Sequence, residues 1–322
     1  MFYHIKNNLH NPTDKKLSIR QAIWQTMAFY DLFSFPLTNL EIIDNLYMHA
    51  DEPVDVLAAL AELRHDRQID FADGFYFLPG RHKLVDTRRE RYLATFKKWH
   101  LINREKYLFR LCPFIKMIGV ANTMAYSNAK ASGDIDLLIV AADRRLFTAR
   151  LLITFWLAIF GRWRHGKQIQ DRYCLSFFVT DRHLNLQSLR LSDSEDIYLT
   201  YWAKWLKPWY VVDRRVAADY FRANQWIKKY LPNCIFTDSS YHADQPYLTT
   251  KIVEWILAGT IGDWLEKILR YVMTDKIRRR HPHDDVDGII VNDRMLKFHP
   301  SGKRREYQNE WQARLRELTK IK

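Results

Sequence analysis

Two aspartates separated by one residue, Asp134 and Asp136, are the residues of this sequence best placed to carry out chemistry. They begin an apolar run, residues 137–140, that is typical of a buried β-strand. Because successive side chains of a strand alternate between its faces, both carboxylates are expected on one face, roughly 6.6 Å apart along the strand. Carboxylates so placed can converge on one or two divalent ions, an arrangement that serves phosphoryl transfer.

The surroundings of this pair distinguish it from a chance pattern. Asp285 and Asp287 repeat the spacing, but they lie between His-Pro-His and Gly288, where a solvated loop is the simplest interpretation. Only the first pair is followed at once by an apolar run and preceded, with ten residues between, by the hydroxyl of Thr123 near the end of another strand-like run. The structural alternative is a turn that enters the strand and is capped by Asp134.

Residues 118–140 resemble the nucleotidyltransferase superfamily that includes DNA polymerase beta. In its small bacterial and archaeal branch, a Gly-Ser pair is followed by a ten-residue gap and a Ser-Asp-x-Asp-Leu strand. The resemblance implies an enzyme with an α/β core and a mixed sheet, in which Asp134 and Asp136 are catalytic and hold one or two Mg²⁺ ions. Such an enzyme transfers a nucleoside monophosphate from an NTP to a hydroxyl acceptor.

The expected phosphate-binding positions depart from the family pattern. Asn122 and Thr123 stand where the family has Gly-Ser, which opens a helix that holds the nucleotide phosphates. Asn tolerates positive φ and Thr keeps a hydroxyl, so we expect nucleotide contact here. Gly119 opens the alternative register, which has no hydroxyl. Lys130 and Ser132 are candidates for further contacts with phosphate from the following loop.

The family also places a third carboxylate on a neighbouring strand, where it completes the metal site. The expected strand is Tyr173–Thr180, whose interior contains no acid. Asp171 and Asp181 flank it and are candidates, while Ser176 is the alternative occupant of that position. Two carboxylates with water still suffice for Mg²⁺, since this ion keeps several waters and binds substrate phosphates.

The first 80 residues predict a winged-helix-like domain. Helical spacing over residues 17–33, 39–46 and 53–63 is followed by two short strand-like runs around Asp73 and Gly74, a dipeptide suited to a tight hairpin turn. The third helix is expected to bury Val54, Leu57, Leu60 and Leu63. Five acids between residues 51 and 66 make it a poor DNA-reading helix, which favours a packing or protein-docking role.

The remainder of the chain divides into three parts. A basic connecting helix is expected over 81–110, a nucleotidyltransferase core over 111–235 and a mostly helical region over 236–322. The basic helix is interpreted as a solvated charged face rather than a nucleic-acid track. Residues 147–160 predict a buried crossover helix, and residues 289–298 an extra strand or hairpin. Six tryptophans are expected in the core: Trp202, Trp205, Trp209, Trp226, Trp255 and Trp264.

Composition limits the function classes. The 322-residue chain carries 50 Lys and Arg against 37 Asp and Glu, a net charge of +13 that favours polyanionic partners such as nucleotides or nucleic acid. Three scattered cysteines offer no disulfide framework, and no apolar run is long enough to span a membrane. We therefore expect a cytoplasmic α+β protein. The functional alternative is a catalytically weakened nucleotidyltransferase fold that binds nucleic acid or protein.

Overall fold

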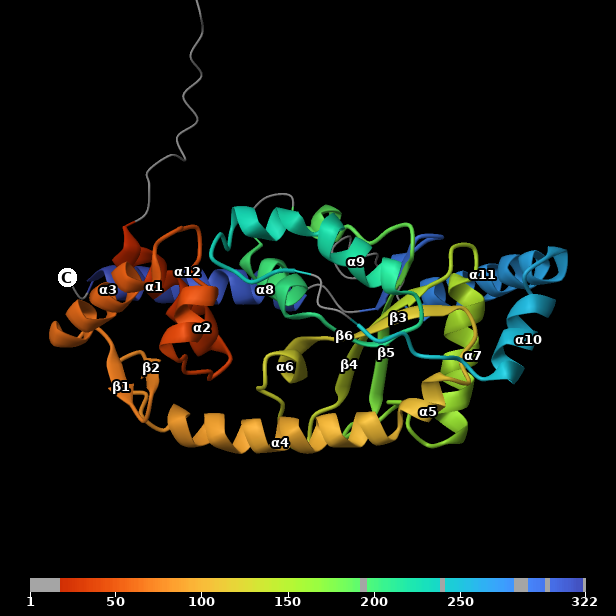
Figure 1. The fold of residues 1–322 in the computed structure, drawn as a ribbon, viewed down its shortest axis with the longest axis horizontal. Coiled ribbons are helices and arrows are strands. Elements are labelled where there is room, and N and C mark those ends of the chain that lie inside the picture. Colours follow the sequence, from red (N-terminus) through yellow and green to blue (C-terminus); the bar gives the residue numbers. More distant parts are fainter. Residues whose placement is uncertain (1–17, 192–195, 238–240, 281–288, 299–301, 321–322) are drawn as a thin grey trace, which may run out of the picture.

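A six-stranded mixed sheet forms the centre of the molecule (Figure 1). Its strands follow the order β6, β3, β4, β5, β8, β7, in which β4 and β5 are parallel and every other neighbouring pair is antiparallel. The bounds are Ile115–Val120 (β3), Ile135–Ala141 (β4), Tyr173–Thr180 (β5), Lys207–Val211 (β6), Ile289–Val291 (β7) and Met295–Phe298 (β8). The mixed α/β architecture expected from the sequence is therefore confirmed.

The computed structural model describes residues 18–191, 196–237, 241–280, 289–298 and 302–320. The second aspartate pair, Asp285 and Asp287, lies outside the described residues. Among the described residues, no helix combines the length and the apolar character needed to cross a bilayer.

Three helices and a hairpin precede the sheet: α1 (Ile19–Leu32), α2 (Asn39–Asp44), α3 (Pro53–His65), β1 (Asp70–Ala72) and β2 (Phe75–Phe77). Asp73 and Gly74 have φ values of 51° and 86°, which confirms the predicted turn. The predicted inner face of α3 is partly wrong. Val54 and Leu57 are exposed, and α3 buries Val56, Ala59, Leu60 and Leu63 instead.

The long helix α4 (Leu84–Arg104) joins this N-terminal part to the sheet, followed by the short α5 (Lys106–Phe109). Figure 1 shows α4 running from the hairpin to the strands. The expectation of a solvated charged face is wrong at two positions, because Arg88 and Lys98 are buried. Arg88 pairs with Glu41 at 2.6 Å, so part of the basic character of α4 stabilises the fold.

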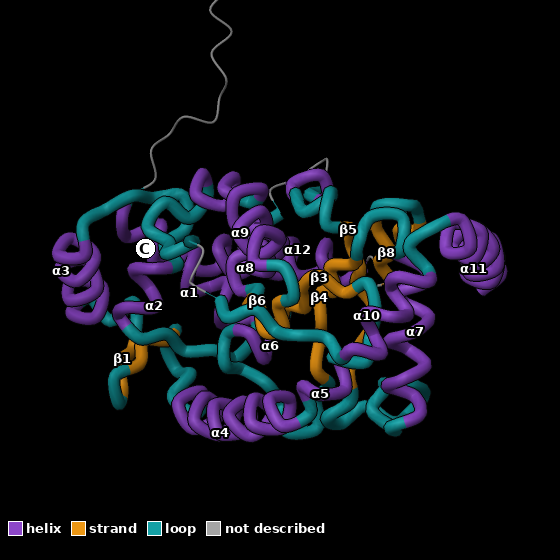
Figure 2. The backbone as a smooth tube through the Cα atoms, turned by 45° about the vertical axis from the view of Figure 1, so that its right-hand side comes forward, coloured by secondary structure: helices purple, strands orange, loops and turns teal. Residues whose placement is uncertain are grey.

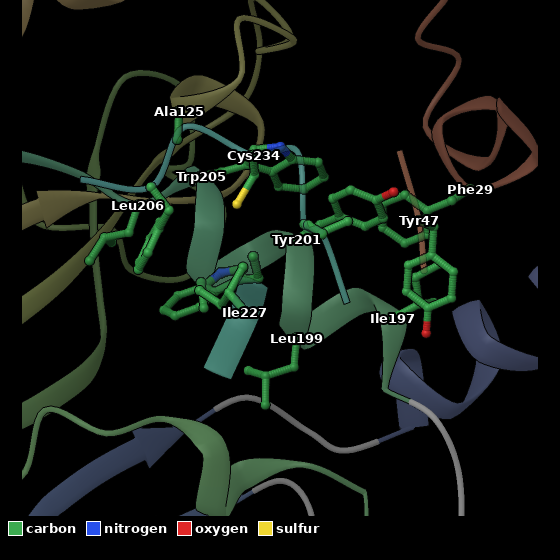
Figure 3. Close-up of a cluster of buried hydrophobic side chains, with 14 of the residues drawn as sticks. Phe29, Tyr47, Ala125, Ile197, Leu199, Tyr201, Trp205, Leu206, Ile227 and Cys234 are labelled. Atoms are coloured by element: carbon green, nitrogen blue, oxygen red, sulfur yellow. The ribbon is translucent and has the colours of Figure 1, made fainter. Parts of the chain in front are cut away.

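Helices cover both faces of the sheet. The predicted crossover is α7 (Leu146–Ile159), which connects the parallel strands β4 and β5 and packs beside α11 (Thr260–Arg280), as Figure 2 shows. Its predicted burial is wrong for one side of the helix, because Phe155 and Ile159 are exposed. On the other face, α8 (Ile197–Trp205) places Tyr201 on Phe29 of α1, with ring centroids 4.4 Å apart (Figure 3). One apolar core thus continues from the N-terminal helices to the sheet.

The C-terminal part of the chain contacts both the sheet and the N-terminal helices. Strands β7 and β8 extend the sheet, and α12 (Gly302–Lys320) packs on α1, where the indole Nε1 of Trp311 donates to the carbonyl of Gln25 at 2.9 Å. Between β6 and β7 the chain forms α9 (Arg214–Ala223), α10 (Leu248–Ile256) and α11. The prediction of buried tryptophans is wrong for Trp255 and Trp264, which are 79% and 68% exposed. Trp202, Trp205 and Trp209 are buried as expected.

Candidate functional site

Asp134 and Asp136 lie at the beginning of β4, beside the beginning of its parallel neighbour β5. Cys174 of β5 is the direct strand partner of Asp136. One ligand atom from each of Asp134, Asp136 and Cys174 falls within 4.8 Å of the other two, so the three side chains form one cluster. The convergence of the two carboxylates agrees with the alternation of side chains along a strand.

An irregularity in β5 shapes the cluster. Asp136 pairs with Cys174 and Leu138 with Phe177, so β5 contains one more residue than β4 over this stretch. Such a bulge changes which face the following side chains occupy. Before the bulge, Cys174 and Ser176 share a side of β5, and Cys174 Sγ lies 3.3 Å from Ser176 Oγ. Cys174 therefore lies on the strand next to the two aspartates, within reach of both carboxylates.

Burial and the nearby Asp134 charge raise the pKa of Asp136 to about 6, although hydrogen bonds from Asn122 and Cys174 act in the opposite direction. Burial, with the Asp136 charge, also raises the pKa of the Cys174 thiol to about 11, so this side chain is a neutral thiol at pH 7. Arg164 supplies the opposing charge, with its Nη1 atom 2.7 Å from Asp134 Oδ2. The cluster is thus an acidic site whose repulsion one arginine only partly relieves.

Asn122 and Thr123 begin α6 (Asn122–Ala125), a single turn between β3 and β4. Asn122 has a φ of 52°, as the expectation of positive φ required. Its Oδ1 atom accepts from the hydroxyl of Tyr198 at 3.1 Å, and its side chain also hydrogen-bonds to Asp136. Asn122 therefore orients one of the two carboxylates.

The alternative register at Gly119 has a packing explanation. A Cβ atom at this position would lie 2.8 Å from the side chain of Leu206, which is closer than packed atoms approach. Gly119 lies inside β3, so the chain uses glycine here to let Leu206 pack against the sheet.

Lys130 and Ser132 are exposed in the loop between α6 and β4. The backbone of this loop is held by α4: Lys98 Nζ donates to the carbonyls of Ala131 at 3.3 Å and Gly133 at 2.8 Å. The loop leads directly into Asp134, so the same contacts fix the start of β4.

The two candidate third carboxylates lie elsewhere. Asp171 Oδ1 is 2.5 Å from the ammonium group of the buried Lys98 and forms an ion pair with it. Asp181 follows the far end of β5, where its Oδ1 atom accepts from the backbone N–H of Asp143 at 3.0 Å. Neither belongs to the cluster of Asp134, Asp136 and Cys174.

The sequence analysis did not single out Cys174 and Arg164. Alternation along Tyr173–Thr180 places Cys174 on the same side as Ser176, which is the one signal that pointed toward it. Arg164 stands in the loop between α7 and β5, and nothing in its sequence surroundings predicts its approach to Asp134.

The donor set fits a hard divalent cation. Asp134 and Asp136 supply the carboxylate oxygens that Mg²⁺ prefers, and an ion between them would relieve the repulsion that raises the pKa of Asp136. The neutral thiol of Cys174 is a poor ligand for Mg²⁺, which leaves the remaining coordination positions to water or substrate oxygens.

Comparison of the chain with protein-family models, with curated proteins and with solved structures finds no match in any of the three.

Proposed function

We propose that this protein is a Mg²⁺-dependent nucleotidyltransferase that passes a nucleoside monophosphate from an NTP to a hydroxyl acceptor. The observation that carries the proposal is the cluster of Asp134, Asp136 and Cys174 at the beginnings of two parallel, adjacent strands. The resemblance of residues 118–140 supports it, because the family's third metal-binding position also lies on a strand next to the aspartates.

In the proposed reaction, a hydroxyl oxygen of the acceptor forms a bond to the α-phosphorus of the NTP. The bond from that phosphorus to the β-phosphate breaks, and pyrophosphate and a proton leave. Bound to Asp134 and Asp136, Mg²⁺ would neutralise charge on the phosphates. To hold the ion, Asp134 would give up its contact with Arg164, while Asn122 keeps Asp136 in place through their hydrogen bond.

Nucleotide contacts are proposed for four residues around the loop that precedes β4. Asn122 and Thr123 offer backbone N–H groups at the turn after β3, and the exposed Lys130 and Ser132 offer an ammonium group and a hydroxyl. In this arrangement Lys130 neutralises phosphate charge from the solvent side of the loop.

We also infer that α1, α2, α3 and the β1–β2 hairpin form a winged-helix-like unit with a docking role. The exposed surface of α3 includes Asp55 and Glu62, whose charges repel a phosphate backbone. The exposed Val54 and Leu57 of the same helix suit contact with protein.

The second candidate function is a binding or regulatory protein that retains the fold with a weakened site. It is favoured by one observation: the third position holds the neutral thiol of Cys174, while Arg164 neutralises Asp134. In that case nucleic acid or another protein is the partner, and nucleotide transfer does not occur.

The test is pyrophosphate release from each of the four NTPs with Mg²⁺ and a mixture of RNA, protein and small polyol acceptors. The wild type is compared with the Asp134→Ala, Asp136→Ala double variant and with Asp181→Ala, whose carboxylate lies at the far end of β5. We expect release by the wild type and Asp181→Ala, and loss of at least a thousandfold in the double variant. Release that survives the double variant would contradict the proposal, and absence of release with salt-dependent binding of RNA would favour the second candidate.

A further inference from the structure

A polar pocket of about 260 Å³ opens beside the carboxylate cluster. It shares Cys174 with the cluster and is lined further by Ser176 of β5, Arg150 of α7, and Arg164 and His165 of the following loop. None of the described residues that line this pocket is a carboxylate. The cluster and the pocket thus meet along one wall with opposite electrostatic character.

Arg150 is the least compensated cation in this wall. Among the described residues no Asp or Glu pairs with it, and burial lowers its pKa to about 10, so it remains charged at pH 7. Its guanidinium lies over the ring of Phe298 at 4.1 Å and over that of Phe178 at 5.2 Å. The ring faces attract the guanidinium, but they carry no net charge, so an anion beside Arg150 would add a charge–charge attraction that the rings do not supply.

Besides its ring contacts, Arg150 has one hydrogen bond with a structural role, and these contacts together account for only part of the side chain. Arg150 Nη1 donates to the carbonyl of Leu175 at 2.8 Å, within the stretch where β5 carries its extra residue. A neutral donor would satisfy this carbonyl equally well, since one hydrogen bond uses one of the five N–H groups of a guanidinium. The positive charge and the remaining donors are left for the pocket.

The neighbouring groups favour a phosphate over a singly charged anion. Arg164 and His165 are exposed at the rim, and the Ser176 hydroxyl adds a polar group on the β5 side. If Asp134 held a divalent ion, Arg164 would lose its ion-pair partner and would add a second full charge to the pocket. Two arginines and a histidine match the two negative charges and several acceptor oxygens of a phosphomonoester.

We propose that this pocket binds a phosphate group of the acceptor substrate, so that the acceptor is a phosphomonoester-bearing molecule. The pocket binds phosphate whether or not the protein is a nucleotidyltransferase. The assignment of that phosphate to the acceptor substrate rests on the proposed function. Held by Arg150, the acceptor reaches the cluster from the β5 side, whereas the nucleotide approaches from the loop before β4.

Binding of inorganic phosphate, followed by ³¹P NMR titration without divalent ions, tests the pocket alone. We expect Arg150→Gln to weaken binding at least tenfold, Arg150→Lys to weaken it less, and His165→Ala to weaken it about threefold. Arg182→Gln is the matched control, because it removes an equal charge from a side chain that is 76% exposed beyond the far end of β5. Unchanged affinity in both Arg150→Gln and His165→Ala, or an equal loss in Arg182→Gln, would overturn the proposal.

The Asp134→Ala, Asp136→Ala double variant separates this inference from the proposed function. It should bind inorganic phosphate at least as tightly as the wild type, since Arg164 is then free, even though it transfers no nucleotide. Because His165 is exposed, His165→Ala keeps the test valid if Arg150→Gln does not fold. Metal-free ATP serves as the second ligand: an Arg150→Gln loss for ATP as large as that for a phosphomonoester would assign the pocket to the nucleotide and overturn the acceptor assignment.

Discussion

Two acidic sites lie at the beginnings of β4 and β5, and they are built in opposite ways. At the first, Asp171 meets the buried Lys98, which also holds two backbone carbonyls of the loop before β4. At the second, Asp134 and Asp136 face each other and the thiol of Cys174, with Arg164 touching one carboxylate from an exposed loop. The first site has its full complement of partners within the chain, and the second has not.

This difference separates an acid that stabilises the fold from the two acids to which the proposed function assigns a ligand. A buried lysine beside one carboxylate lowers the free energy of the folded state only while both partners remain. Crowded carboxylates instead cost free energy, which a bound cation returns. The position of a carboxylate near a strand end therefore does not distinguish a structural acid from a candidate metal ligand. The groups that contact the carboxylate do.

The largest expected effect is on stability at the first site. Lys98→Met leaves the Asp171 carboxylate and the carbonyls of Ala131 and Gly133 without their donor, and should lower the free energy of unfolding by about 3 kcal/mol. Urea denaturation measures this. A loss below about 1 kcal/mol would mean that the contact is not a structural one.

At the second site, removing a charge should raise the free energy of unfolding rather than lower it. The pKa of Asp136 is about 6 in the folded protein against about 3.9 in an unfolded chain, so folding binds a proton more tightly and stability falls as pH rises from about 4 to 6. Asp136→Asn removes this penalty and should stabilise the metal-free protein by about 2 kcal/mol at pH 7.5. The gain should vanish at pH 4, which a pair of thermal unfolding series would measure. A stability loss at pH 7.5 would contradict the assignment.

A bound divalent ion should stabilise the wild type as the Asp136→Asn substitution does, because it also offsets the carboxylate charge. At ten times its dissociation constant, Mg²⁺ or Mn²⁺ is expected to stabilise the wild type by about 1.4 kcal/mol, seen as a rise in Tm. The Asp134→Ala, Asp136→Ala double variant should show no rise. Lys98→Met should keep the rise if the first site has no part in metal binding.

The smallest effect is expected at an exposed ion pair, which calibrates the others. Arg89 lies 2.8 Å from Asp73, and the two side chains are 55% and 57% exposed. Arg89→Met should change the free energy of unfolding by less than about 0.5 kcal/mol. A change as large as that of Lys98→Met would remove the distinction between buried and exposed pairs on which the comparison depends.

Local patterns in the sequence predicted much of this structure. The turn at Asp73 and Gly74, the crossover helix and the shared face of Asp134 and Asp136 each depend on residues close together in the chain. The pairing of Asp136 with Cys174 depends on an extra residue in β5, which no alternation pattern reveals. The reach of Lys98 to Asp171 depends on helix placement across 73 residues of sequence.

The exposed tryptophans show the same limit on the surface. Trp255 and Trp264 have the apolar character of core residues, but the sequence does not specify which side of α10 and α11 faces the rest of the molecule. Burial of a helix face is decided by the neighbour that covers it.

Helix α4 contacts both the N-terminal helices and the loop that leads into β4. Three residues of this helix hydrogen-bond to the loop. Arg91 donates to Asn128 Oδ1 at 3.1 Å, and Thr95 Oγ1 accepts from the Ala129 N–H at 3.0 Å. Lys98 donates to the carbonyl of Gly133. One helical turn before Arg91, Arg88 is anchored to Glu41 of α2. The residues that lead into Asp134 therefore take their position from the same helix that is anchored to α2, so the N-terminal helices and the start of β4 share one support.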